Sequence, residues 1–357
     1  MKQKIKITVF FIFLCGSAFI FTGAGKTQTA QTETLTAGQK FKNIKVLNDM
    51  PADQMGKVMN LMSASLGVNC NFCHVGYDFE KDGKEEKETA REMIRMTFEL
   101  NKNYFGGRQE ISCNTCHNGR AHPQSVPNLN LAKSEERPVQ PETLPTIEQI
   151  LDKYVLALGG KANLEKIASR YIKANRVEPD GTIEPEEIWQ KSPDKYLLVT
   201  KYPNYTVSEA FDGNQVWKRG NADEITLKAD EIEQVKREAA LFAPLKLAKI
   251  YQKMETIVVD KIDGREVYVV RATASNSLRE RLYFDVATGL LARRVASTPT
   301  VLGNFPYQVD YQDYKIFGAV KLPTTVRYAV PHISWTRKVL DVKINQTIDD
   351  AKFAAPK

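Results

Sequence analysis

The chain has 357 residues, a formal net charge of +7, 26% charged residues and five cysteines. It is long enough for more than one domain with its own core. Three of the positive charges lie in the first six residues, and no basic stripe with interleaved aromatic residues follows, so the composition argues against nucleic-acid binding.

Residues 1–25 begin with three lysines and continue without a charge from Ile7 to Gly25. This pattern is typical of a secretory signal peptide, and the uncharged run is also just long enough to span a bilayer as an uncleaved N-terminal anchor. Either alternative predicts a periplasmic or otherwise extracytoplasmic protein, with or without a membrane anchor. A flexible segment is expected at residues 26–40.

Two pairs of cysteines follow the first cysteine, Cys15, which lies inside the apolar run. Each pair has the spacing Cys-x-x-Cys, and a histidine directly follows each pair. Two disulfides or a four-cysteine zinc site would use the cysteines but would leave both histidines unexplained. Cys-x-x-Cys-His is the attachment signature of c-type haem, so the sequence predicts two covalent haems at Cys70, Cys73 and His74 and at Cys113, Cys116 and His117.

The signature assigns a role to each residue. The four thiols form thioether bonds with the porphyrin vinyl groups, and each histidine supplies the proximal iron ligand. Only His122 and His332 remain among the four histidines, and His122 lies in a loop where a solvated side chain is expected. Methionine is therefore the predicted distal ligand.

Six of the eight methionines lie between residues 50 and 96. Met55, Met59 and Met62 recur at helical spacing in residues 52–67, as do Met93 and Met96 in residues 88–105. Such stripes are usually core packing, so we expect one methionine of each helix to bind iron and the others to pack. The charge-dense run between the motifs, residues 79–92, is expected to be a solvated loop and exposed helical turns.

The block from Met59 to His117, which contains "SLGVNCNFCH", "MIRMT" and "CNTCHNG", resembles the cytochrome c subunit of photosynthetic reaction centres. That family binds four haems, each beside a helix, a turn and the binding motif. The resemblance implies Met59, eleven residues before Cys70, and Met93, which opens "MIRMT", as distal ligands, with Met62 and Met96 as alternatives. It covers about residues 41–130 and only two motifs, so it implies no photosynthetic partner. A mostly α-helical dihaem domain is expected at residues 41–133.

A proline-rich linker is expected at residues 134–144, followed by an α+β domain at residues 145–357. Two short helical patterns precede alternating runs of strand type. Turn dipeptides predict hairpins at Asp180-Gly181, Asp212-Gly213 and Asp263-Gly264, and a helical segment at residues 228–253 should end or kink before Pro244. These patterns predict a curled antiparallel sheet, or half-barrel, with helices against it and few contacts to the haem domain.

The phrases "YFDVATGLL", "GAVKLPTTVRY" and "VKINQTIDDAKF" resemble the half-barrel of lipoprotein carriers of the LolA/LolB type. The resemblance implies a face that holds an acyl chain, a lipoprotein or a partner segment. The domain contains no Ser-His-Asp set, glycine-rich phosphate loop or metal-binding cluster.

The favoured function is that of an electron carrier, not an enzyme, passing single electrons between extracytoplasmic redox proteins or membrane electron-transfer complexes. Two alternatives remain open. One is a dihaem peroxidase-like enzyme with one open haem site, which the scarcity of histidine disfavours. The other is a lipid- or lipoprotein-binding module in which the haems are secondary.

Overall fold

The computed structural model describes residues 35–126, 140–221, 223–241, 243–274 and 279–356, all within one compact unit. The predicted signal peptide or anchor, residues 26–34 of the flexible segment and residues 134–139 of the linker lie outside the described residues. Among the helices that the structure describes, none combines the length and apolar character needed to cross a membrane.

The N-terminal region is helical, as predicted. Its two long helices end at glycines with left-handed backbone conformations, Gly67 (φ +65°) and Gly106 (φ +62°). The elements are α1 (Ala37–Lys40), η1 (Ala52–Gln54), α2 (Met55–Leu66), η2 (Cys70–Phe72), α3 (Glu85–Phe105) and α4 (Cys113–His117). We call the buried apolar cluster of this region the helical core: Ala37, Leu47, Met50, Val58, Ile94 and Leu302.

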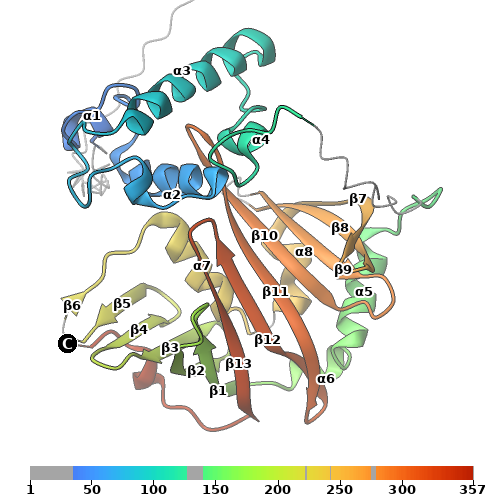
Figure 1. Ribbon diagram of the computed structural model, residues 1–357. Coiled ribbons are helices and arrows are strands. Elements are labelled where there is room, and N and C mark those ends of the chain that lie inside the picture. The colour runs from blue at the N-terminus through green and yellow to red at the C-terminus, as the bar shows by residue number, and fades with distance from the viewer. Residues whose placement is uncertain (1–34, 127–139, 222, 242, 275–278, 357) are drawn as a thin grey trace, which may run out of the picture. The chain divides into compact units, whose positions relative to one another are not determined.

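The C-terminal region is one antiparallel sheet, shown in Figure 1, in the order β6-β5-β4-β3-β2-β1-β13-β12-β11-β10-β9-β8-β7. All three predicted Asp-Gly turns join neighbouring strands. The described strands are β1 (Ser169–Val177), β2 (Ile183–Lys191), β3 (Lys195–Lys201), β4 (Thr206–Phe211), β5 (Val216–Gly220), β6 (Asp223–Glu224), β7 (Tyr251–Ile262), β8 (Arg265–Ala274), β9 (Arg279–Asp285), β10 (Leu291–Thr300), β11 (Gly303–Phe317), β12 (Val320–Val330) and β13 (Ile333–Ile344).

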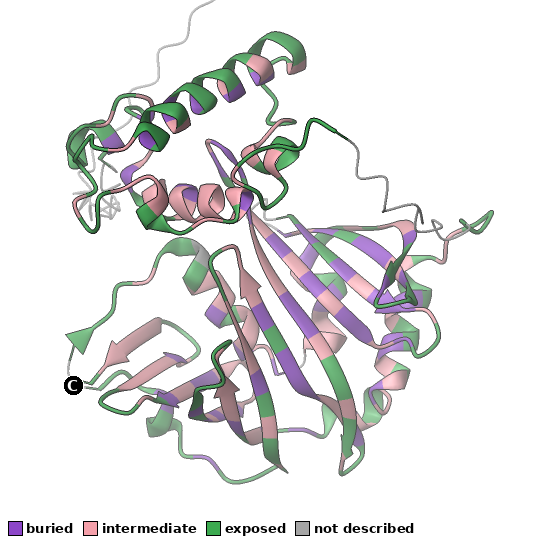
Figure 2. Cartoon of the chain, viewed as in Figure 1, coloured by how far each residue is buried: buried purple, intermediate pink, exposed green. Residues whose placement is uncertain are grey.

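Helices pack against this sheet through alternate strand residues, which gives the striped burial in Figure 2. The helix α7 contacts β3 and β4, whereas α5 and α8 contact each other and β7. The break between α7 and α8 comes just before Pro244, as expected. The elements are α5 (Ile147–Ala157), α6 (Lys161–Glu165), α7 (Ala229–Ala239), α8 (Ala243–Ile250) and η3 (Asp350–Phe353).

Charged side chains are buried between α7 and the sheet. Arg237 of α7 pairs with Glu280 of β9 at 2.8 Å, and the Tyr251 hydroxyl donates to the same carboxylate at 2.5 Å. Burial and the nearby Glu280 charge raise the pKa of Tyr251, which keeps the phenol protonated. Within the sheet, Arg337 of β13 pairs with the buried Glu186 of β2 across the intervening strand β1. The helix is therefore fixed to the sheet by ionic as well as apolar contacts.

The two regions make contact at the β10–β11 hairpin. Leu302, at its tip, is 2% exposed and belongs to the helical core. The side chain of Gln109 donates to the Thr300 carbonyl at 2.6 Å. The sequence pattern around the linker could not reveal this contact, because it joins residues about 190 positions apart. The domain boundaries themselves stay predictions.

The described end of the linker is fastened to the outermost strand, β7. The Gln140 side chain donates to the Val259 carbonyl and accepts from the Val259 N–H, both at 2.9 Å. The Thr256 hydroxyl donates to the Pro145 carbonyl at 2.9 Å. A side-chain amide thus makes the pair of bonds that a neighbouring strand would make.

Candidate haem sites

The first motif comes directly after α2, and local hydrogen bonds hold it in a single turn. Gly67 ends the helix, and the Asn69 side chain then accepts from the Asn71 N–H at 3.1 Å, which begins η2. The His74 N–H donates to the Cys70 carbonyl at 3.0 Å. One helical turn thereby holds both cysteines and the histidine of the motif.

A cavity of about 550 Å³ lies beside this motif. Its volume falls in the range of about 300–1,000 Å³ typical of sites for small molecules and cofactors. The lining comes from the loop at residues 41–47, α2, the motif, the following loop and α3. It includes all the residues predicted for the first haem, namely Met59, Met62, Cys70, Cys73 and His74. Both candidate methionines line the cavity, so the structure does not separate Met59 from Met62.

The side chains of this motif fit a bound cofactor. The Nδ1 atom of His74 is buried and has no hydrogen-bond partner in the structure. Burial, followed by the charge of Lys87, lowers the pKa of His74, so the imidazole is neutral and able to bind a metal. Burial also raises the pKa of the Cys73 thiol. A buried polar nitrogen without a hydrogen bond is unfavourable, and a bound group or an ordered water beside it would satisfy it.

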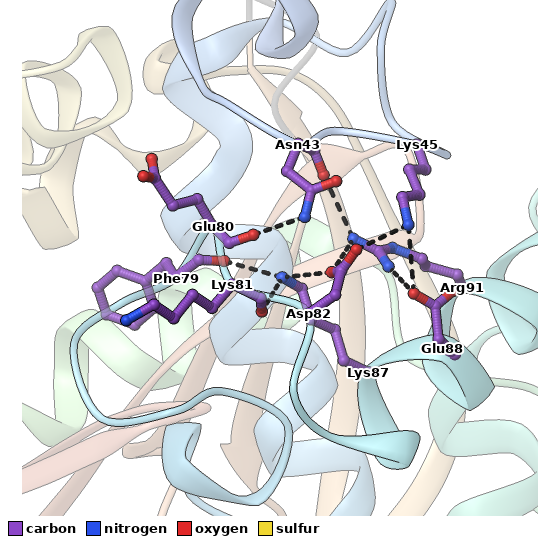
Figure 3. A network of polar contacts seen from close by, with 9 residues as sticks. All are labelled: Asn43, Lys45, Phe79, Glu80, Lys81, Asp82, Lys87, Glu88 and Arg91. Atoms are coloured by element: carbon purple, nitrogen blue, oxygen red, sulfur yellow. Dashed lines mark hydrogen bonds and ion pairs between the residues drawn. The ribbon is translucent and has the colours of Figure 1, made fainter.

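A network of charged side chains, drawn in Figure 3, lies beside the cavity and includes the lining residues Lys45, Lys87 and Arg91. The Asp82 carboxylate accepts from Lys45 at 2.7 Å and from Arg91 at 2.9 Å, and Lys87 lies 3.1 Å away. Hydrogen bonds from Lys45 and then Arg91 hold the pKa of Asp82 well below its usual range. The network joins three segments that line the cavity: the loop at residues 41–47, the loop after the motif, and α3.

The sequence pattern did not predict that the charged run, residues 79–92, contributes buried side chains to the cavity. Residues 79–92 were expected to be solvated, but Lys87 and Arg91 are buried on α3. Both line the cavity, as does Lys45 across from them. The spacing of Lys87, Arg91 and Ile94 along one helix face was the signal that could have indicated burial.

The second motif forms α4, which is preorganised by its own sequence. Ser112 caps the helix and forms a reciprocal pair of hydrogen bonds with Thr115, and Asn118 ends it in a left-handed conformation (φ +46°). Nδ1 of His117 donates to the Arg120 carbonyl at 2.9 Å. This bond fixes the tautomer and leaves Nε2 with a lone pair for a metal.

The candidate methionines of the second site lie on α3 and are partly exposed, Met93 by 37% and Met96 by 41%. They project from a different side of the helix than the buried Ile94. The cavity at the first site includes none of the residues predicted for the second haem. The structure therefore brings together the first predicted set, whereas the ligation of the second haem stays a prediction.

Asn101 connects α3 to the second motif, and sequence reasoning did not single it out. Its buried side chain donates to the Ile111 carbonyl at 2.8 Å and accepts from the N–H groups of Glu110 and Ile111 at 3.0 and 2.9 Å. The loop before Cys113 is thus held against the helix that carries Met93. A polar residue within an apolar helical stripe was the available signal.

The two motifs meet at the C-terminal end of α2. The Gly119 N–H, just after the second motif, donates to the Ser65 carbonyl at 2.8 Å. A Cβ atom on Gly67 would lie 2.1 Å from the Gly119 oxygen, so only glycine permits this approach. The helix α2 therefore lines the first site and supports the second.

The remaining metal-binding alternatives gain no support from the geometry. The four motif cysteines form no disulfide, and the described part of the chain has no cluster of three or more His, Cys, Asp and Glu side chains arranged around a metal position. His122 and His332 are exposed and do not line the cavity.

Two Cys-x-x-Cys-His turns, each following a methionine-bearing helix, are typical of c-type cytochromes. Residues 22–149 match the family described as the photosynthetic reaction centre cytochrome C subunit, which confirms the resemblance inferred from the motifs. The photosynthetic reaction center cytochrome c subunit of Roseobacter denitrificans is 31% identical over 96 residues, covering 24% of this chain and 26% of that protein. Cytochrome c-554 of Chloroflexus aurantiacus is 32% identical over 102 residues, covering 25% of each chain. The chain thus spans about a quarter of the length of these relatives.

Two solved structures are similar to part of this chain at low sequence identity. A LolA superfamily protein from Nitrosomonas europaea has a TM-score of 0.43 and 13% identity, covering 59% of this chain and 99% of that one. A DUF1329 family protein from Desulfovibrio piger has a TM-score of 0.43 and 11% identity, covering 59% of this chain and 98% of that one. Similarity at this level carries no information on a ligand.

Proposed function

We propose that this chain is a dihaem c-type cytochrome that passes single electrons between extracytoplasmic redox proteins or membrane electron-transfer complexes. The observation that carries the proposal is the cavity that unites Met59, Cys70, Cys73 and His74. The cytochrome relatives support the class of protein, and the second motif supports the number of haems.

The residues have the following proposed roles. Cys70 and Cys73 anchor the first cofactor, and Cys113 and Cys116 anchor the second. His74 and His117 are the proximal ligands, and Met59 and Met93 are the distal ligands, with Met62 and Met96 as the alternatives. When bound, haem iron would supply one-electron redox chemistry.

Each part of the protein then has a physical task. Apolar side chains of α2 and α3 give the first site part of its lining, and the Asp82 network holds the loop after His74 in place. The Arg120 carbonyl orients His117. Because α2 lines the first site and the Ser65 carbonyl of its last turn accepts from the Gly119 N–H, one helix supports both motifs.

The test is to produce the full chain with a c-type haem maturation system and to measure its mass and its absorption spectrum. We expect two covalent haem additions and a spectrum of the reduced protein that carbon monoxide does not change. A single addition would reduce the proposal to one site, and no addition would overturn it. A carbon monoxide adduct would instead show an open haem site, as the peroxidase-like alternative requires.

The lipid- or lipoprotein-binding alternative is tested in the same preparation. Buried ion pairs between α7 and the sheet, such as Arg237 with Glu280, disfavour an acyl chain there. Binding of a fluorescent fatty acid by the full chain would support the alternative. The N-terminal signal and extracytoplasmic location are checked by fractionating cells and sequencing the mature N-terminus.

A further inference from the structure

The tip of the β10–β11 hairpin, residues 300–303, contacts the helices that form both candidate haem sites. Leu302 is almost fully buried in the helical core together with Val58 of α2 and Ile94 of α3. Met59 and Met62 pack against the same cluster. A side chain from the sheet therefore contributes to the packing that fixes the helix carrying the candidate ligands of the first haem.

Hydrogen bonds set the position of this tip. The Val301 N–H donates to the side chain of Gln54 at 3.3 Å, and Gln54 is the N-cap residue of α2. The Gln109 side chain donates to the Thr300 carbonyl. Within the hairpin, the Thr300 hydroxyl donates to the Gly303 carbonyl at 2.7 Å, so the turn is shaped before it meets the helices.

Gly303 allows the closest approach. Its φ of +132° lies in the region that favours glycine. A Cβ atom there would lie 3.3 Å from Cβ of Ser112 and 3.7 Å from Cδ2 of Leu61. Ser112 caps α4, and Leu61 belongs to α2. The hairpin backbone thus lies against the N-cap of the second motif and against the methionine-bearing helix.

We propose that residues 300–303 position the haem-binding helices, and that Leu302 holds α2 where its methionine can bind iron. The inference rests on the proposed function for the identity of the ligand. Leu302 supplies no iron ligand itself and acts through α2, so it is a positioning residue. Removing its side chain opens space in the helical core into which α2 can shift, and metal ligation tolerates shifts of only about 0.5 Å. The C-terminal domain is then required for methionine ligation although it contributes no ligand.

The test compares Leu302→Ala with Leu282→Ala in the full chain. Leu282 is equally buried, but it lies in the core between the sheet and the helices α5 and α8, away from the haem motifs. We expect both variants to retain two covalent haems and to be destabilised. Only Leu302→Ala should weaken the sulfur-to-iron absorption band of the ferric protein, by about twofold if one haem is affected. The conservative Leu302→Met should restore the band.

Hydrogen exchange of α2 provides a measurement that does not depend on the ligand. In Leu302→Ala the amides of residues 55–66 should exchange roughly tenfold faster than in Leu282→Ala, because the helix loses its partner in the sheet. The inference would be overturned if Leu302→Ala kept the whole sulfur-to-iron absorption band and if its α2 amides exchanged no faster than those of Leu282→Ala. Absence of haem from the unaltered chain would instead overturn the proposed function, and faster α2 exchange alone would still support the positioning role.

Discussion

At the first Cys-x-x-Cys-His turn, side chains from α2, α3 and two loops surround a cavity, and Nδ1 of His74 is buried without a partner. At the second turn, a capped helix and the Arg120 carbonyl already orient His117, while Met93 and Met96 are partly exposed. The two Cys-x-x-Cys-His turns are thus held in place by different kinds of interaction. The first depends on long-range packing and the second on local hydrogen bonds.

This comparison predicts unequal effects of removing each haem. We expect Cys70→Ala/Cys73→Ala to lose one haem and to be destabilised by roughly 3–5 kcal/mol, as when a large side chain is removed from a core. Cys113→Ala/Cys116→Ala should also lose one haem, with less than half of that loss of stability. Mass spectrometry and thermal unfolding provide the measurements. Equal destabilisation of the two variants would show that the sites do not differ in this way.

The distal ligands can be assigned by single substitutions. Met59→Ala and Met93→Ala should each remove about half of the sulfur-to-iron band and lower the potential of one haem by on the order of 100 mV. Their neighbours, Met62→Ala and Met96→Ala, are the controls and should keep the band. If Met62→Ala loses the band while Met59→Ala keeps it, the ligand of the first site is Met62. The same comparison of Met96→Ala with Met93→Ala decides the ligand of the second site.

Asn101→Ala tests whether the second site depends on its connection to α3. The change leaves the N–H groups of Glu110 and Ile111 without their acceptor and should cost roughly 2–3 kcal/mol. We expect the band of the second haem to weaken and that of the first to stay unchanged. Asn103→Ala, at an exposed position of the same helix, is the matched control. A uniform change in both haems would contradict separate control of the sites.

The smallest expected effect is at the Asp82 network. The pKa of Asp82 is lower in the folded protein than its unfolded value of about 4, so its contribution to stability is present above that pH and is lost as the pH falls further. Asp82→Asn should therefore weaken the decline in stability below about pH 4. Chemical unfolding at several pH values measures this, with Asp49→Asn as an exposed control. An unaltered pH profile would show that the network does not stabilise the wall of the cavity.

Local chemistry in the sequence was enough to predict much of the molecule. The spacing of Cys70, Cys73 and His74 predicted one shared site, and these residues line one cavity. Asp263-Gly264 predicted a hairpin, because this pattern, like the first, is read within a few residues. Pro244 indicated the break between two helices for the same reason.

Features that depend on distant pairs could not be predicted from one sequence. Leu302 looks like an ordinary residue of a strand turn, and only the folded chain shows that it fills the helical core. Lys87 and Arg91 look solvated until Asp82 is brought beside them. The choice between Met59 and Met62 stays open because both face the same cavity.

The bonds between Gln140 and Val259 have a further consequence for solubility. An open sheet offers two outer strands whose free N–H and C=O groups can recruit another chain and start aggregation. Here one outer strand, β6, has only two residues, both acidic, and the other, β7, has a side-chain amide on its backbone groups near Val259. The segment that links the two regions thus also shields the sheet from pairing with a second molecule.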